Sequence, residues 1–276
     1  MHLEDFWLGQ RLVSAAVTLG AEDLVAFASL TGDQHPMHLP GSGRPDAEVV
    51  GHGPWGLARY FGTVWADGSL EDSVIGLVQS DWRYVAPLRI GATYTWHTVV
   101  TGWRRSSSDP SRGILHRDVQ MIDAEGRVVQ AGTLVALVAA ARPDGADDPA
   151  GALPLSADWA HAVVARLEDS VEFHDATQTF DGTIGLESPA ASIQLRVYKG
   201  RVIDVARRTP GGADFTLVGS ARAWCDLMTA PRNDFVVRTS NGEFSVVGNA
   251  YVYLQLTRAL HLVVDAGRTI TEGASR

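Results

Sequence analysis

Residues 53–65 read Gly-Pro-Trp-Gly-Leu-Ala-Arg-Tyr-Phe-Gly-Thr-Val-Trp. The proline falls in the first turn, where its missing N–H costs nothing, so we expect a helix over Pro54–Trp65. Apolar side chains lie on nearly every face of this helix, and Arg59 is its only charge. Because a helix that is apolar all round is usually buried, the stretch predicts a helix at the centre of its domain.

The segments on either side of this helix complete one domain. A short amphipathic helix is expected before it, over Ala21–Leu30, with acidic residues at its start. The segments after it are typical of strands, and Asp123-Ala124-Glu125-Gly126 forms the turn between the last two. The expected strands are Asp72–Tyr84, Thr93–Trp103, Ile114–Ile122 and Arg127–Ala139. One buried helix wrapped by a long antiparallel sheet is an α+β architecture.

A segment rich in Pro, Gly, Ala and Asp, residues 141–154, divides the chain. It has no apolar period, which is typical of a linker. We therefore predict a first domain over 1–142, a linker over 143–154 and a second domain over 155–276.

The second domain is also expected to be α+β. Its pattern predicts helices near both of its ends, with strands and one further helix between them. The helices are expected over Ala157–Glu172, Ser220–Thr229 and Asn249–Val264, and the strands over Thr177–Leu186, Ser192–Tyr198, Val202–Ala206, Asp214–Val218 and Glu243–Val247.

Composition excludes several classes of function. The chain has 276 residues with 23 Lys+Arg against 32 Asp+Glu, a formal net charge of -9, so we expect no binding to nucleic acid. Cys225 is the only cysteine, which excludes an internal disulfide framework and a cysteine-based zinc site. The acidic start lacks the pattern of a secretory signal, and the longest apolar run, Leu134–Ala141, is too short to span a bilayer. A cytoplasmic protein without membrane insertion is the expectation.

The most informative motif is Gly32-Asp33-Gln34-His35-Pro36-Met37-His38. Pro36 disfavours helix for the residue before it, so Asp33 and His38 are expected to converge on a rigid bend. A carboxylate and an imidazole within reach of one water can activate it and move its proton, which makes these two residues the candidate catalytic pair. The alternative is that Asp33 caps a turn and His38 is a partly exposed polar residue. The histidines elsewhere lack ligand spacing, so no metal site is expected.

A second motif, Gly51-His52-Gly53-Pro54, leads directly into the apolar helix. A glycine at a helix N-terminus lets a ligand carbonyl approach free backbone N–H groups and the positive end of the helix dipole. This is the arrangement of an oxyanion hole. The alternative is that both glycines only permit a tight turn.

With these residues in view, the first half resembles the MaoC-like, (R)-specific enoyl-CoA hydratase family. The resemblance implies a hotdog fold, a homodimer with its acyl site near the subunit contact, and a water oriented by Asp33 and His38. It implies His35, His52 and Gly53 as substrate-binding residues, and no cofactor beyond the coenzyme A or phosphopantetheine carrier protein that holds the acyl group. His35 stands where the family commonly has Asn, and residues 39–50 are shorter than usual. The resemblance is carried by Glu4-Asp5-Phe6, Gly9-Gln10, Ala26–Asp33, Pro36, His38, His52-Gly53, Pro87–Gly91 and Gly126–Val129.

The second half has a characteristic order of motifs: Phe180-Asp181-Gly182, the hairpin Ser192–Val205, Ala213–Val218, Trp224 and Gly242–Asn249 before the last helix. In these residues it resembles the sterol carrier protein type 2 family of lipid-binding domains. The resemblance implies a hydrophobic tunnel for an acyl chain or another lipid, and the alternative is a closed core that binds nothing.

Three functions follow for the whole chain. The first is a hydro-lyase that adds water to an enoyl thioester or removes it from a 3-hydroxyacyl thioester. The second is a non-catalytic acyl- or lipid-binding protein whose first half is a dimerising scaffold, which the short segment 39–50 favours and the presence of Asp33 and His38 disfavours. The third is a hotdog thioesterase.

Overall fold

The computed structural model describes residues 1–68, 70, 72–142 and 153–274, which form two compact units. Of the described residues, the first unit contains Met1–Phe6, Gln10–Val100 and 105–142. The second contains Trp7–Gly9, Thr101–Arg104 and 153–274. Residues 143–152 of the predicted linker lie outside the described residues.

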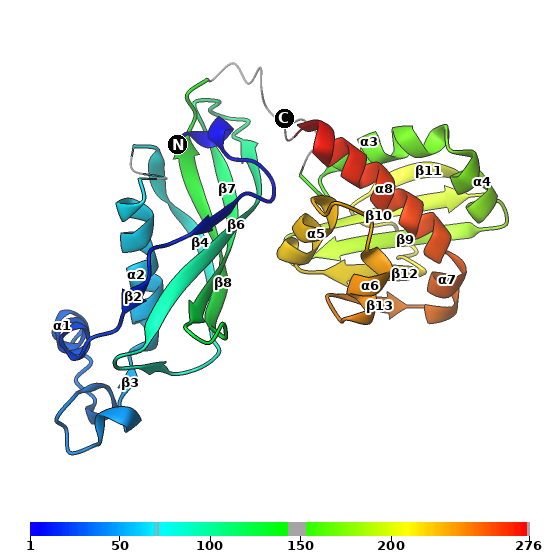
Figure 1. Cartoon of the computed structure of the whole chain (residues 1–276). Helices are drawn as coiled ribbons and strands as arrows, with labels where there is room; N and C mark the ends of the chain where they lie inside the picture. The colour runs from blue at the N-terminus through cyan, green and yellow to red at the C-terminus, as the bar shows by residue number, and fades with distance from the viewer. Residues whose placement is uncertain (69, 71, 143–152, 275–276) are drawn as a thin grey trace. The chain divides into compact units, whose positions relative to one another are not determined.

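In the first unit the longer helix, Gly53–Ala66, lies along a curved sheet (Figure 1). The strand order is β1-β6-β7-β8-β4, with β2 also on β6, and the pairs β1/β6, β7/β8 and β4/β8 are antiparallel. A separate short pair joins β3 to β5. The elements are β1 Arg11–Val13, β2 Val17–Thr18, α1 Ala21–Thr31, β3 Val50–Gly51, α2 Gly53–Ala66, β4 Val74–Tyr84, β5 Leu88–Arg89, β6 Thr93–Arg105, β7 Arg112–Asp123 and β8 Val128–Ala139.

Helix α2 packs against the sheet at close range. The indole N–H of Trp96 on β6 donates to the carbonyl of Gly56 over 3.1 Å. A Cβ at Gly56 would lie 2.3 Å from Oε1 of Gln130 on β8 and 2.8 Å from the sulfur of Met121 on β7, so a larger residue would have to displace these buried side chains. Trp55 and Tyr60 of the helix are buried in the same core. This central helix on an antiparallel sheet is the hotdog arrangement, and the predicted α+β class is confirmed.

The apolar helix α2 lies at the centre of the unit as predicted, but one of its faces is exposed. Phe61 is 39% exposed and Trp65 is 63% exposed. The sheet covers only one face of the helix, so side chains on the opposite face remain at the surface of the unit.

Strand β4 is an edge of the six-stranded sheet and is unusually apolar for an edge. It pairs with β8, and two irregularities in register occur along it, at Val74/Gly76 and Leu77/Gln79. Most of its side chains are exposed, including Ile75 at 53% and Val78 at 59%. An exposed apolar edge strand offers unpaired backbone groups to another strand.

Glu4 fastens the N-terminus of the first unit to its sheet. Its carboxylate accepts hydrogen bonds from the guanidinium of Arg105 (3.0 Å) and from the N–H groups of Ala141 (3.0 Å) and Arg142 (2.9 Å). Burial raises the pKa of the Glu4 carboxyl, but the hydrogen bonds from Arg142, Ala141 and Arg105 outweigh it and lower the pKa to about 2. The charged form therefore stabilises the fold above the ordinary pKa near 4.5, and this stability is lost as the pH falls toward 2.

We expect Glu4→Gln to lower the free energy of unfolding by up to about 3 kcal/mol at pH 7, because one pKa unit corresponds to about 1.4 kcal/mol. The difference from the wild type should shrink at pH 3. Chemical denaturation at both pH values measures it, with the exposed Glu48→Gln as the control. An equal difference at the two pH values would contradict the role assigned to the Glu4 charge.

The second unit is a five-stranded sheet with helices, and Figure 1 shows α8 crossing one face of it. The strand order is β11-β10-β9-β12-β13, and β12 runs parallel to β9 while the other pairs are antiparallel. The predicted α+β class is confirmed here too. The elements are α3 Ala157–Glu168, α4 Val171–Thr177, β9 Asp181–Ser188, β10 Ala191–Tyr198, β11 Arg201–Ala206, β12 Phe215–Gly219, α5 Ala221–Met228, α6 Phe235–Ser240, β13 Phe244–Gly248, α7 Ala250–Gln255 and α8 Thr257–Ala274.

Two predicted helices of this unit are each divided in the structure. The helix expected over Ala157–Glu172 ends at Glu168, and α4 begins after Ser170, whose side chain accepts from the N–H of Phe173. The last helix is interrupted at Leu256, between α7 and α8. Helix α6 was not predicted. Among the described residues, none of the helices combines the length and the apolar composition needed to cross a bilayer.

Candidate active site

The end of α1 places Asp33. Gly32 has φ +77°, a left-handed conformation that glycine adopts without strain, and its N–H donates to the carbonyl of Ala28 over 2.9 Å. The chain turns away from the helix there. Oδ1 of Asp33 then accepts the N–H of His35 over 3.3 Å. This contact links Asp33 to the bend that follows it.

Pro36 begins a 3₁₀ turn, Pro36–His38, that carries His38 back toward Asp33. The side chain of His35 caps this turn, because its Nδ1 accepts the N–H of Met37 over 3.2 Å. The N–H of His38 donates to the carbonyl of His35 over 2.9 Å. A proline at this position fixes its own backbone angle, which makes the bend stiff.

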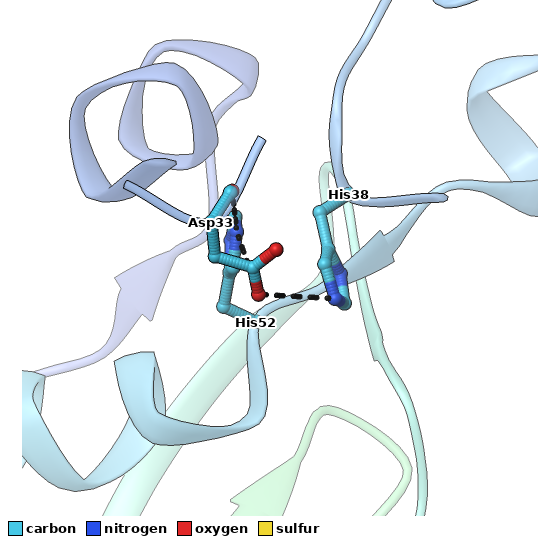
Figure 2. Close-up of side chains that lie close together, drawn as sticks. All are labelled: Asp33, His38 and His52. Carbon is cyan, nitrogen blue, oxygen red and sulfur yellow. Dashed lines mark hydrogen bonds and ion pairs between the residues drawn. The ribbon is translucent and has the colours of Figure 1, made fainter. Parts of the chain in front are cut away.

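Three side chains from separate segments converge, as Figure 2 shows: Asp33 after α1, His38 in the 3₁₀ turn, and His52 before α2. Oδ2 of Asp33 lies 3.8 Å from Nε2 of His38 and 3.9 Å from Nε2 of His52. The exposed fraction of these side chains is 51% for Asp33, 16% for His38 and 2% for His52. The carboxylate is therefore open to solutes, while the two imidazoles are fixed behind it.

The hydrogen bond made by His38 determines which of its nitrogens is a base. Nδ1 lies 2.6 Å from the carbonyl oxygen of Val50 in β3. A carbonyl only accepts, so Nδ1 carries the hydrogen, and Nε2 of the neutral ring has a free lone pair. That lone pair is on the nitrogen nearest to Asp33. Two acceptors 3.8 Å apart do not bond each other, but both can accept from one small donor placed between them.

His52 positions its two partners. Its Nε2 lies 3.0 Å from the main-chain oxygen of Asp33, so this nitrogen donates to a carbonyl by the same argument. Its ring stacks on that of His38, with centroids 4.2 Å apart and 28° between the planes. Nδ1 of His52 is buried without a hydrogen-bond partner among the described residues. The imidazole thus holds the backbone of Asp33 and the ring of His38 against the start of α2.

Gly53, the first residue of α2, is also held from the sheet. The side-chain amide of Gln130 donates to the Gly53 carbonyl over 2.9 Å, and Gln130 Oε1 accepts the indole N–H of Trp82 over 2.8 Å. The Gly53 N–H belongs to the first turn, where helical N–H groups lack an intrahelical acceptor. A Cβ at Gly53 would lie 3.0 Å from two ring carbons of Tyr84, a residue that is 55% exposed. The helix terminus therefore lies beside an exposed aromatic ring.

The structure brings together Asp33, His38 and His52, and Gly53 is adjacent to His52 in the chain. His35 lies to the side: it is exposed, its ring centroid is 6.3 Å from that of His38, and its Nδ1 is used in the cap. Its substrate-binding role stays a prediction. The sequence did not indicate that the His52 side chain would contact Asp33.

The same three residues have the composition of a small metal site, since one donor atom from each lies within 4.8 Å of the others. The hydrogen bonds oppose this use. Ligation through Nε2 of His52 would need the lone pair of this nitrogen, so its hydrogen bond to the carbonyl oxygen of Asp33, 3.0 Å away, would be lost. The hydrogen would move to the buried Nδ1, which has no acceptor in the described part of the chain. The geometry therefore fits a small donor shared by Asp33 and His38 better than it fits a metal ion.

Comparison of the sequence with family models and with curated proteins finds no match. Solved structures similar to part of this chain include a MaoC-like dehydratase from Rhodospirillum rubrum, 23% identical, with a TM-score of 0.44, covering 51% of this chain and 99% of that chain. An (R)-hydratase from Pseudomonas aeruginosa is 16% identical with a TM-score of 0.42, covering 51% and 86%. An (R)-hydratase from A. caviae is 20% identical with a TM-score of 0.39, covering 48% and 96%.

Proposed function

We propose that the first unit is a hydro-lyase that adds water to an enoyl thioester, or removes it from a 3-hydroxyacyl thioester. The observation that carries this proposal is the 3.8 Å separation between Oδ2 of Asp33 and Nε2 of His38, with the His38 tautomer determined by Val50. A water between these two acceptors donates one hydrogen to each. Its oxygen lone pairs then point away from both, toward a substrate.

The chemistry needs one proton removed and one returned. As the water oxygen bonds to C3, one member of the pair accepts a proton from it, and the electrons of the C2=C3 bond move onto the thioester carbonyl as an enolate. A proton is then delivered to C2, which restores the carbonyl. The same groups run the sequence backward as a dehydration, so the site serves both directions.

The start of α2 is the proposed place for the thioester carbonyl. The free N–H of Gly53 and the helix dipole would stabilise the enolate oxygen, and the first turn of α2 contains no acidic residue to oppose them. We propose that coenzyme A or the phosphopantetheine arm of an acyl carrier protein presents the substrate.

A second copy of the chain is the proposed partner of β4. The strand is an apolar edge with unpaired backbone groups, and pairing with an identical strand would cover Ile75 and Val78. The side chain of Asp33 is 51% exposed, so one side of the site is uncovered in a single copy of the chain. We propose that the second copy covers this side and contacts the acyl group.

The test is a hydration assay on the full chain with crotonyl-CoA. We expect the absorbance of the conjugated thioester to fall without release of free thiol, and we expect a chelator to leave the rate unchanged. Release of thiol would indicate a thioesterase. If the absorbance does not fall and no thiol is released, the protein is a non-catalytic one that only binds acyl groups or lipids. Loss of activity with the chelator would indicate that Asp33, His38 and His52 bind a metal ion. Light scattering on the same sample should give twice the chain mass.

We further propose that the second unit binds an acyl chain or another lipid. Five apolar side chains on neighbouring elements of this unit are exposed by 46% or more. Exposed apolar groups of this kind often mark a binding site. They come from α6, β13 and α7, and are Val236, Val237, Val247, Tyr251 and Leu254.

If these side chains contact a lipid, mass spectrometry of the protein purified under native conditions should detect bound lipid. Val237→Glu should reduce the amount by tenfold or more, because a charge at an apolar contact must be desolvated. Ile203→Glu, also an exposed apolar position but on β11, is the matched control. No lipid in the wild type, or equal amounts in both variants, would leave the second unit without a lipid site.

A further inference from the structure

Tyr84 is an exposed aromatic residue beside the start of α2 that the proposed mechanism does not use. It is the last residue of β4 and lies directly opposite Gln130 of β8. Residues directly opposite in an antiparallel pair project their side chains from the same face of the sheet. The Gln130 side chain donates to the carbonyl of Gly53, so the Tyr84 side chain also projects toward the first residue of α2.

The ring of Tyr84 contacts Gly53 without being buried. A Cβ at Gly53 would lie 3.0 Å from Cδ1 and Cε1 of the ring, which places the ring against the glycine backbone. The residue is nevertheless 55% exposed, so part of the ring is open to a ligand. Gly53 follows His52, whose Nε2 lies 3.9 Å from Oδ2 of Asp33. An open aromatic surface therefore adjoins the candidate active site.

The part of β4 that we assign to a second copy of the chain lies farther back along the strand. Val78 is six residues before Tyr84 and Ile75 is nine, which is about 20 Å and about 30 Å along an extended strand. Pairing with a second copy at Val78 and Ile75 does not use the ring of Tyr84, which projects toward α2.

The position of the ring determines which part of a thioester it meets. A carbonyl oxygen on the N–H of Gly53 lies about 2.9 Å from that nitrogen. The carbonyl carbon, the sulfur and C2 then lie close to the Gly53 backbone, where the ring of Tyr84 also lies. The sulfur, carbonyl, C2 and C3 of an enoyl thioester form a planar unit, which can lie flat against an aromatic ring. The nucleotide end of coenzyme A is separated from the carbonyl by the long pantetheine arm.

We propose that Tyr84 is a substrate-binding residue whose ring contacts the thioester group itself, a role that rests on the proposed function because that function places the carbonyl at Gly53. The contact shields the carbonyl oxygen from water, and a lower local dielectric strengthens its hydrogen bond to the Gly53 N–H. The contact requires the flat ring and not the phenol hydroxyl.

Calorimetric titration of the full chain with acetyl-CoA, butyryl-CoA and free coenzyme A tests the proposal. None of the three has a C2=C3 bond, so binding is measured without hydration. Tyr84→Ala should weaken the binding of both thioesters at least tenfold and leave the dissociation constant of free coenzyme A unchanged. Tyr198→Ala is the matched control, because Tyr198 is also the last residue of its strand and is 43% exposed. It should bind all three as the wild type does.

Two further variants separate the ring from the hydroxyl and from the fold. Tyr84→Phe keeps the ring and should retain the binding of both thioesters. Tyr84→Thr removes the ring but suits a strand, so it takes the place of Tyr84→Ala if that variant does not fold. Circular dichroism identifies which variants fold.

The proposal is overturned if the wild type binds neither thioester, or if the variants without the ring bind both as tightly as the wild type. It is also overturned if these variants lose free coenzyme A to the same extent, or lose butyryl-CoA alone, because the ring then contacts the carrier or the acyl chain. A tenfold loss with Tyr84→Phe would assign the contact to the hydroxyl and contradict it as well. Thioester binding that depends on Tyr84, without hydration of crotonyl-CoA, would contradict the hydro-lyase proposal alone.

Discussion

Asp33→Asn should lower the turnover of a crotonyl thioester by about 10²- to 10⁴-fold, the range that a positioned acid or base contributes. An amide is neutral and does not accept a proton at neutral pH, so it cannot activate a water that also contacts His38. The variant should fold normally. Oδ1 of Asp33 accepts a single N–H, from His35, and the amide oxygen of Asn can replace it. Steady-state kinetics and a thermal melt of the same sample measure both outcomes.

Asp46→Asn is the matched control for this prediction, because Asp46 is exposed on the same long connection between α1 and α2. Its turnover should equal that of the wild type. The distribution of the effect between kcat and KM identifies the role of Asp33. A fall in kcat fits a group that acts on the reacting water, whereas a rise in KM alone would assign Asp33 to substrate binding and remove it from the catalytic pair.

The sequence predicted most of the elements that build this site. Pro54 at the start of an apolar segment indicated α2 to within one residue at each end. Pro36 between Asp33 and His38 indicated a bend, and the structure places the two side chains 3.8 Å apart. These predictions depended on local backbone preferences, which proline and glycine express strongly.

Contacts between distant segments could not be predicted in this way. His52 donates to a carbonyl nineteen residues earlier in the chain, and Arg117 lies beside Tyr60, fifty-seven residues away. The motif around His52 indicated a role for the start of α2 but not this contact, and Arg117 has no sequence pattern that distinguishes it from an ordinary strand residue. The exposed face of α2 is a further case, because the count of apolar side chains does not say which of them the sheet covers.

The second large effect is expected at His38, where two substitutions separate its two nitrogens. Asn has an amide nitrogen near the position of Nδ1, so His38→Asn keeps a donor for the carbonyl of Val50 and loses only Nε2. His38→Ala loses both. Each variant should lower turnover by about 10²- to 10⁴-fold. His38→Ala should also unfold more easily by about 1 kcal/mol, the usual net value of one hydrogen bond. The exposed His161→Asn, in the second unit, is the control.

The double variant Asp33→Asn/His38→Asn tests whether the pair acts on one water. Groups that act as a unit are not additive, because the loss of either removes most of what the other contributes. We therefore expect the double variant to turn over about as slowly as the slower single variant. If the two losses multiply instead, Asp33 and His38 act in separate steps, and the shared water between Oδ2 and Nε2 is the wrong description of this site.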